Sequence, residues 1–356
     1  MNTEKKNQHY IPKFYLKNFS YKKNDKQIGI FNLKSSFFFQ TSKLKTQGSK
    51  NFFYGYDGVI EDGLSEIEGL LSQTINKLIT TRKLPLKNSK DHVKLLIFIA
   101  LTDVRNPVKI NNMKSMMVNM KERILESSPE ADVEKLVPEM SHEEVVNLAL
   151  ATIPEITQNI LDLDYKLLIN ETGYPFISSD FPIVKYNQFL EKKKWGHSKS
   201  GYSVNGLQIF FPLNSEIVLH FFDSAIYRVG DKRQKNVPLK DKKDVDRINQ
   251  LQLVNCLETI YFNEKASEEY IRSISIQSLK FNRANSPKSE LNYIVRDGDD
   301  KDELLKSGKK NLIILGSSDC ETDLEITCIK IHSKGKVAKL NSSMAQLRKF
   351  TRSLKD

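Results

Sequence analysis

The stretch EDGLSEIEGLLSQTINKLITTRK, residues 61–83, is where the chain changes from strand-like to helical character. The preceding residues 27–60 carry β-formers in QIGIFNL and SSFFFQ, and turn chemistry in YGYDG. In residues 61–83 the apolar positions recur mostly three or four apart, which predicts one face of a helix. These positions are Leu64, Ile67, Leu71, Ile75, Leu78 and Ile79.

Further helices are expected after this stretch. Ser89 can cap a helix that runs through KLLIFIALTDVRN, and a methionine-rich helix follows over about residues 109–126. Ser141 and Glu144 have the spacing of a capping box, which predicts another helix start. Pro154 should kink or divide that helix. The middle of the chain is therefore predicted to be all-helical.

Strand signals return after residue 164, in YKLLINE, FISSDFPIVKYN and LQIFFPLNSEIVLHFFD. A helix is predicted for KDKKDVDRINQLQLVNCLE, then a short strand for ETIYFNE and a helix for SEEYIRSISIQSLKF. Strands and helices do not alternate regularly, so a doubly wound parallel sheet is not expected. The sequence predicts an α+β fold with a β-rich N-terminal entry, an all-helical middle and a mixed C-terminal half.

We expect one elaborated domain over residues 1–285, with a helical subdomain at about 61–165 and a mixed part at about 165–285. Residues 286–356 are predicted to hold a polar linker, two short strands in NLIILGS and LEITCIKIH, and a basic tail that could form an amphipathic helix.

Composition narrows the class of protein. No apolar run approaches the roughly 20 residues of a membrane helix, and the N-terminus lacks an apolar signal core. The three cysteines, Cys256, Cys320 and Cys328, have no metal-ligand spacing, and their odd number argues against a disulfide framework. A cytoplasmic location is expected.

The chain is basic, with 55 Lys and Arg against 44 Asp and Glu and a formal charge of +11. Such a surface favours phosphate-bearing partners through counterion release. The abundance of Lys, Asn and Ile has a second explanation, because an AT-rich genome enriches the same residues. Charge alone leaves nucleic-acid binding open.

Established catalytic motifs are missing from the sequence: it has no P-loop, GxGxxG, HExxH, GxSxG or CxxC pair. The candidates are polar residues in apolar surroundings, where a charge must be paired or useful. His9, in QHYIP, can transfer a proton near neutral pH or pack against the backbone. Glu68 borders the helix face beside Ile67 or is solvated. Arg105 ends an apolar helix, where it binds an anion or caps the helix.

Two candidates come from the second half of the chain. Asp180 follows a strand-like run in FISSDFP, a place suited to a metal ligand or general base, or to an Asx-turn that ends the strand. Asn255 lies among apolar residues of a helix, so it belongs to a polar network or to a site. Asp180 and Glu68 are the carboxylates that could hold Mg²⁺ or Mn²⁺.

Residues suited to bind a nucleic-acid backbone lie in two segments. Lys13 and Lys17 are expected to face solvent or a phosphate. Lys193, Lys194 and the sole tryptophan, Trp195, lie in the loop EKKKWGHSKS, where the indole could stack on a base. The alternative is that this loop is only solvated.

With these residues in view, the chain resembles a family of bacterial proteins catalogued as domain of unknown function 4238. The family opens with Q-H-Y-[VI]-P-x-F-x-L-[RK]-x-F, which stands here as QHYIPKFYLKNF, residues 8–19. Its F-[IL]-[ST]-S-D-x-P element stands as FISSDFP, residues 176–182, with Phe181 where the family often has Asn. Weaker landmarks follow the same order, over about residues 7–280: Glu61 and Glu68 in ExxLSxIE, Arg105, FPL at 211–213, and Asn255 before Ile260-Tyr261.

The resemblance implies that His9, Glu68, Arg105, Asp180 and Asn255 form one site, and it names no reaction. Some members are associated with defence against phage. The first hypothesis is therefore an anti-phage effector that acts on nucleic acid, a metal-dependent nuclease in its most specific form. The second is a non-catalytic sensor that binds nucleic acid, a nucleotide, a phage component or a partner protein. A third is a structural network that holds the N-terminus in place.

Overall fold

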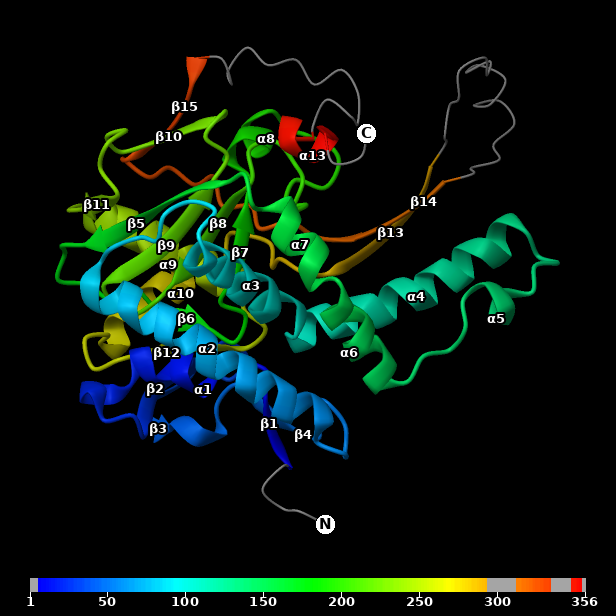
Figure 1. Cartoon of the computed structure of the whole chain (residues 1–356), viewed down its shortest axis with the longest axis horizontal. Coiled ribbons are helices and arrows are strands. Elements are labelled where there is room, and N and C mark those ends of the chain that lie inside the picture. Colours follow the sequence, from blue (N-terminus) through cyan, green and yellow to red (C-terminus); the bar gives the residue numbers. More distant parts are fainter. Residues whose placement is uncertain (1–5, 293–311, 334–346, 354–356) are drawn as a thin grey trace.

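The computed structural model describes residues 6–292, 312–333 and 347–353. Helices and strands are both abundant, and the strands form several separate sheets, which confirms the α+β class (Figure 1). Within the described residues, even the longest and most apolar helices fall short of what crossing a bilayer requires.

The N-terminal fifty residues form short strands and turns, as the β-formers there predict. A two-stranded antiparallel sheet pairs His9 with Ser49. The elements are β1 (Asn7–His9), α1 (Lys13–Leu16), η2 (Lys17–Phe19), η3 (Tyr21–Lys23), β2 (Gln27–Asn32), β3 (Phe37–Lys43), η4 (Leu44–Thr46) and β4 (Ser49–Asn51).

The middle region consists of helices, and its caps are the ones that the sequence predicts. Ser89 caps α3, and Ser141 with Glu144 forms the capping box of α6. Pro154 lies in the first turn of α7, and the predicted helix is divided there into α6 and α7. The helices are α2 (Val59–Thr81), α3 (Lys90–Val104), α4 (Pro107–Ser127), α5 (Val133–Leu136), α6 (His142–Ala151) and α7 (Ile153–Asn159).

The buried stripe of α2 differs from the prediction at one position. Ile67 is 42% exposed, whereas Leu64, Leu71, Ile75 and Leu78 are buried. These buried positions are three, four or seven apart, and Glu68 falls on the same stripe. The prediction that Ile67 belongs to the core was wrong, because a helix of 3.6 residues per turn places Glu68 there instead.

A five-stranded sheet in the order β11-β5-β9-β8-β7 forms the centre of the second half. Its strands are almost wholly buried, and β11 is parallel to β5 while the other pairs are antiparallel. The elements of this part of the chain, of which α8 and β10 lie outside the sheet, are β5 (Asp164–Asn170), β7 (Val184–Tyr186), α8 (Gln188–Lys192), β8 (Gln208–Pro212), β9 (Ile217–Phe222), β10 (Tyr227–Val229) and β11 (Asn236–Leu239).

A four-stranded antiparallel sheet has the order β3-β2-β12-β6, and it combines strands from the N-terminal segment with strands from the second half of the chain. Strand β12 pairs with β2 from the N-terminal segment and with β6, which carries the serines of FISSDFP. The elements added here are β6 (Ser178–Ser179), α9 (Lys242–Asn255), β12 (Thr259–Phe262) and α10 (Glu268–Ser278).

The described part of the C-terminal region contains a strand where a linker was predicted. Part of the stretch predicted as a polar loop forms β13 (Pro287–Asn292), which pairs with β14 (Leu312–Ser317) in a ribbon along α4 (Figure 1). The strand predicted in LEITCIKIH is reduced to β15 (Ile329–Ile331), and α13 (Lys349–Ser353) is a short piece of the predicted tail helix. The rest of that tail, residues 334–346 and 354–356, lies outside the described residues.

Residues near the C-terminus complete a hydrophobic core. Leu324, Ile326 and Ile329 are buried against strands of the five-stranded sheet and against α9. The hydroxyl of Tyr186 accepts a hydrogen bond from the Leu324 backbone N–H at 2.8 Å. This segment therefore packs as an integral part of the fold.

Candidate functional site

The strand that carries His9 is held by its neighbour Gln8. The Gln8 side chain donates to the Gly55 carbonyl at 2.8 Å and accepts from the Tyr54 N–H at 2.5 Å. The Tyr54 hydroxyl in turn donates to the His9 carbonyl at 3.1 Å. The QHY motif is thus fastened to the loop that precedes α2, which fixes the backbone of His9.

The His9 ring has a defined tautomer. Its Nε2 lies 3.2 Å from the Lys45 carbonyl oxygen, which can only accept, so Nε2 carries the proton and Nδ1 is the unprotonated nitrogen of the neutral ring. Burial, followed by the charge of Lys13, lowers the pKa of His9 to about 4. His9 is therefore a neutral hydrogen-bond acceptor at physiological pH.

Arg105 is the centre of the site. Its side chain is fully buried, and Nη1 donates to Glu68 Oε1 at 2.6 Å. Its Nε and Nη2 are buried and make no well-aligned hydrogen bond within the described part of the chain, while the guanidinium also interacts with the Tyr54 hydroxyl. Burial opposes the guanidinium charge, but Tyr54 and Glu68 outweigh it, so the pKa of Arg105 is raised and the group stays charged. The backbone of Arg105 also caps α3.

Glu61 is the second carboxylate of this group. Burial, followed by the charge of Glu68, raises its pKa, while Arg105 and the backbone N–H of His9 lower it. Glu61 and Glu68 are only partly buried, so solvent reaches the group from their side. We call His9, Tyr54, Glu61, Glu68 and Arg105 the Arg105 cluster.

Asp180 belongs to a different network. Its Oδ1 accepts the N–H of Leu257 at 2.6 Å, and its Oδ2 accepts those of Glu258 and Thr259, both at 2.8 Å. Burial raises its pKa to about 6, opposed by these bonds. The carboxylate therefore caps the turn between α9 and β12, and its backbone carbonyl accepts from Asn106 at 2.6 Å.

Asn255 braces the same segment from the end of α9. Its amide donates to the carbonyls of Phe181 at 2.8 Å and Ile183 at 3.2 Å, and its oxygen accepts from Asn285 at 2.9 Å. The side chain is 4% exposed, and both ends are hydrogen-bonded. This arrangement fits the alternative that Asn255 is a network member.

Of the five residues expected to form one site, the structure groups His9, Glu68 and Arg105. No hydrogen bond or ion pair among the described residues joins Asp180 or Asn255 to these three. The two carboxylates suggested as metal ligands thus lie in separate networks. In residues 6–292, 312–333 and 347–353, no group of three or more His, Cys, Asp or Glu has the arrangement of a metal site.

Sequence reasoning missed Tyr54, and it named Glu61 without assigning it a role. Glu61 lies seven residues before Glu68, two turns along one helix face, and that spacing was the available signal. Tyr54 joins the cluster only because its loop contacts β1, and that contact has no local sequence signature.

The residues expected to bind nucleic acid lie in different surroundings. Lys13 and Lys17 are both exposed; Lys13 is close enough to lower the pKa of His9, and Lys17 pairs with Asp25 at 3.3 Å. Lys194 and Trp195 line a pocket of about 580 Å³ formed with β13 and the segment after β14. Lys193 lines a different pocket, together with Arg247 and Lys330.

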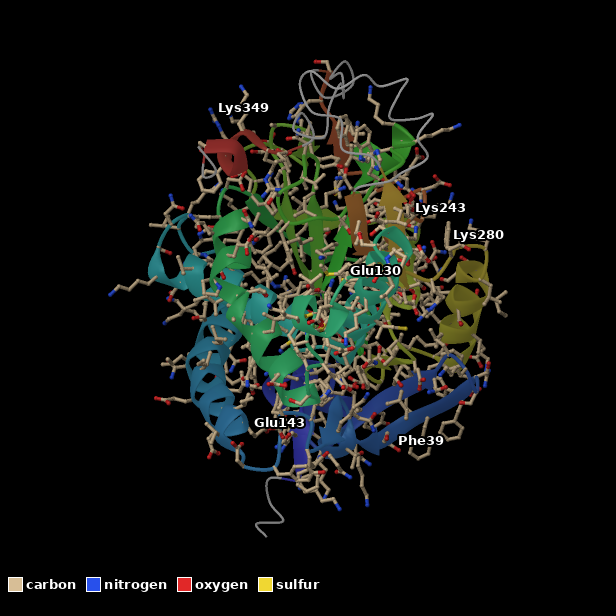
Figure 2. All side chains as sticks on the ribbon, turned by 90° about the vertical axis from the view of Figure 1, so that its right-hand side faces the viewer. Phe39, Glu130, Glu143, Lys243, Lys280 and Lys349 are labelled. Carbon is tan, nitrogen blue, oxygen red and sulfur yellow. The ribbon has the colours of Figure 1, made fainter. Side chains whose placement is uncertain are left out.

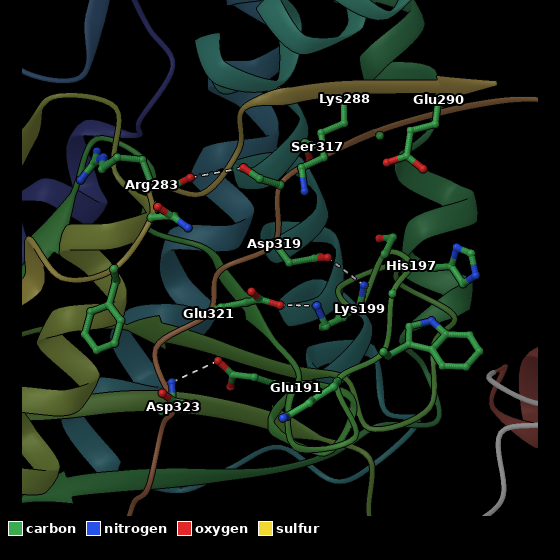
Figure 3. Close-up of a pocket in the computed structure, with 18 of the residues that line it drawn as sticks. Glu191, His197, Lys199, Arg283, Lys288, Glu290, Ser317, Asp319, Glu321 and Asp323 are labelled. Carbon is green, nitrogen blue, oxygen red and sulfur yellow. Dashed lines mark hydrogen bonds and ion pairs between the residues drawn. The ribbon is translucent and has the colours of Figure 1, made fainter. Parts of the chain in front are cut away.

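We call the first of these the Trp195 pocket. Figure 3 shows Lys288 and Glu290 reaching into it from β13, with His197 at its edge. One pair of its charged side chains is already neutralised, because Lys199 forms an ion pair with Glu321. The indole N–H of Trp195 is buried and has no hydrogen-bond partner among the described residues.

A protein-family model matches residues 7–266, most of the chain, and its description is "Protein of unknown function (DUF4238)". The chain belongs to this family. No curated protein and no solved structure matches it. The family region includes the whole Arg105 cluster, together with Asp180 and Asn255, whereas much of the Trp195 pocket is built from residues beyond 266.

Proposed function

We propose that this family member is a hydrolase acting on nucleic acid, with the Arg105 cluster as its catalytic site. The observation that carries the proposal is a fully buried guanidinium whose Nε and Nη2 make no well-aligned hydrogen bond in the described structure. Buried N–H donors of this kind are suited to bind an oxyanion, and a phosphodiester presents two non-bridging oxygens that can accept their hydrogen bonds.

Each residue of the cluster has a role in this proposal. Arg105 binds the phosphate through Nε and Nη2 and stabilises the charge that develops in the transition state, while Glu68 holds Nη1. The neutral His9 accepts a hydrogen bond from the attacking water or hydroxyl at Nδ1. Glu61, with a raised pKa, takes up the proton. The formal charge of +11 favours encounter with a polyanion.

The decisive substitution is Glu61→Gln. It keeps the size and the hydrogen bonds of the side chain but cannot take up a proton, so cleavage should fall about 10²- to 10⁴-fold. Labelled RNA and single- and double-stranded DNA would be incubated with Mg²⁺, Mn²⁺ or EDTA, and products counted on gels. A thermal melt within a few degrees of wild type establishes that Glu61→Gln is folded.

A matched lysine pair tests where the polyanion lies. Lys13→Ala removes an exposed charge that acts on His9, and Lys17→Ala removes an equally exposed charge one helical turn away. We expect Lys13→Ala to weaken turnover and Lys17→Ala to leave it near wild type. Wild-type protein that cleaves none of these substrates in any condition would end the hydrolase proposal.

The second candidate function is a non-catalytic sensor, and the Trp195 pocket favours it. The pocket combines the unpaired indole N–H with cations from two segments, among them Lys194 and Lys288. Trp195 is the only tryptophan of the chain, so its fluorescence reports on this pocket directly. Quenching by oligonucleotides without any cleavage would favour the sensor.

We further propose that either activity serves defence against phage, as the resemblance to defence-associated family members suggests. Bacteria that express the wild-type chain should then survive a phage challenge better than bacteria that express Glu61→Gln. Equal survival of both, with cleavage lost only in the variant, would separate the enzyme activity from defence.

A further inference from the structure

A second group of titratable side chains gathers around the buried Asp103, which lies two residues before Arg105 in the chain. The Asp103 Oδ2 atom lies 3.7 Å from the ammonium nitrogen of Lys109 and 3.9 Å from that of Lys185. The same oxygen accepts the hydroxyl of Tyr202. These residues come from α3, α4, β7 and the loop before β8, and we call them the Asp103 cluster.

The cluster has more positive than negative charge. Asp103 is 1% exposed, and Tyr202 is uncharged because burial and the carboxylate raise its pKa well above the usual value. Two ammonium groups, whose side chains are 21% and 14% exposed, therefore share the buried Asp103 carboxylate. An uncompensated buried cation is unfavourable, and loss of one lysine proton relieves it.

Lys185 is the lysine better placed to lose its proton. Its side chain is 14% exposed against 21% for Lys109. Its nitrogen also lies 4.1 Å from the centre of the Tyr202 ring, a contact that favours the ammonium form and limits the effect of burial. Burial, followed by the charge of Lys109, lowers the pKa of Lys185 to about 8, opposed by Asp103 and Asp319. With a pKa of about 8, roughly a tenth of Lys185 is a neutral amine at pH 7.

We propose that Lys185 is a nucleophilic amine that forms an imine with an aldehyde ligand. The geometry of the Asp103 cluster supplies the other parts of that reaction. Asp103 Oδ1 is buried and has no hydrogen-bond partner in the described structure, so it can accept a proton. Lys109 is an ammonium donor beside the same nitrogen. This inference is independent of the hydrolase proposal, because it uses none of the Arg105 cluster.

The chemical step is balanced without an oxidant or reductant. The Lys185 lone pair attacks the carbonyl carbon, and the C=O electron pair moves to oxygen, which takes a proton from Lys109. The nitrogen gives a proton to Asp103, which leaves a neutral carbinolamine. Asp103 returns this proton to the hydroxyl, which leaves as water while the nitrogen lone pair forms the C=N bond. The protonated imine then gives its remaining proton to Lys109, so that one amine and one aldehyde yield one imine and one water.

Reductive trapping tests the inference on the intact protein. Acetaldehyde with cyanoborohydride converts each imine into a stable ethylated lysine, and peptide mass spectrometry gives the rate at every position. The reference lysines are Lys243 and Lys280, which stand at the surface in Figure 2. We expect Lys185 to react at least about tenfold faster than either at pH 7, with a rate that rises through pH 8.

A matched pair on α4 provides the control. Lys109→Met removes the neighbouring cation, which should slow the reaction at Lys185 about tenfold at pH 7. Lys121→Met changes a lysine of the same helix that pairs with Glu134, and it should leave Lys185 unaffected. Wild-type Lys185 that reacts no faster than Lys243, or that is indifferent to Lys109→Met, overturns the proposal.

The source of the aldehyde can be distinguished in the same way. A DNA strand with an abasic site carries a sugar aldehyde, and borohydride would leave it covalently attached to Lys185 if nucleic acid is the ligand. Trapping of acetaldehyde alone would assign the amine to a small-molecule aldehyde. In a folded Lys185→Arg variant, neither aldehyde should form an adduct at position 185.

Discussion

The ion pair between Arg105 and Glu68 shows how burial decides what an ion pair contributes to stability. Arg105 is fully buried and Glu68 is 21% exposed in its side chain. Glu68→Ala leaves the guanidinium with a weaker set of anionic neighbours, and we expect about 2 kcal/mol of lost stability. The pair Arg123–Glu126 lies at the surface, so Glu126→Ala should change stability by less than about 0.5 kcal/mol. Urea unfolding of both variants measures the difference, and equal losses would contradict it.

Asp180 offers a test that separates structure from catalysis. Its carboxylate accepts three backbone N–H groups, and an asparagine amide would turn its own NH₂ toward one of them. We expect Asp180→Asn to lower the free energy of unfolding by about 3 kcal/mol. The urea midpoint should fall with an unchanged slope. Normal stability with lost cleavage would return Asp180 to the catalytic site.

Sequence reasoning found the candidate residues but not their partners. His9, Glu68 and Arg105 were recognised as polar residues in apolar surroundings, and the structure places them together. Asp180 was recognised for the same reason, yet its partners are backbone N–H groups of residues 257–259. Such donors exist at every non-proline residue, so no sequence pattern distinguishes them. Lys185 was overlooked because its neighbours come from three other segments.

At the scale of elements, two glycines near the start of α2 give opposite predictions. Gly55 has φ +110°, and an added Cβ would lie 2.7 Å from Glu143 Oε1. Gly63 lies inside α2 with open space around it. We expect Gly55→Ala to destabilise the protein by about 2 kcal/mol and Gly63→Ala to stabilise it by up to about 1 kcal/mol. Melting temperatures that move in the same direction would contradict this pair.

Helix boundaries were the most predictable features of the fold, because the sequence signals that mark them are local. Ser89, Ser141 with Glu144, and Pro154 act within a few residues of their own position. Strand β13 was read as part of a linker, whereas β14 lies in NLIILGS, which was predicted as a strand. The error at β13 arose because its partner strand and its packing against α4 are distant in sequence. Polar composition alone could not reveal a pairing between residues 287–292 and 312–317.

At the scale of the whole molecule, buried histidines make stability depend on pH. Burial, followed by the charge of Lys166, lowers the pKa of His220 to about 3, against about 6.5 when unfolded. Below pH 6.5 the unfolded chain binds a proton that the native state does not, so stability falls with pH until about pH 3. His220→Gln should therefore reduce the slope of stability against pH by about 1.4 kcal/mol per pH unit between pH 6 and 4. Urea unfolding at several pH values measures this slope, and an unchanged slope would contradict it; at pH 8 the pH-linked difference should vanish.

The N-terminal segment makes some of its contacts with strands that follow much later in the chain. The Tyr15 hydroxyl bonds to Ser178 and to the Pro212 carbonyl, both at 2.7 Å and the latter 197 residues away. At about 5–20 residues per second, roughly 10 to 40 seconds pass during translation between these two residues. For that interval Tyr15 at the start of the nascent chain lacks these native partners. The growing polypeptide should then be a chaperone client, and slow synthesis should raise its loss to aggregation.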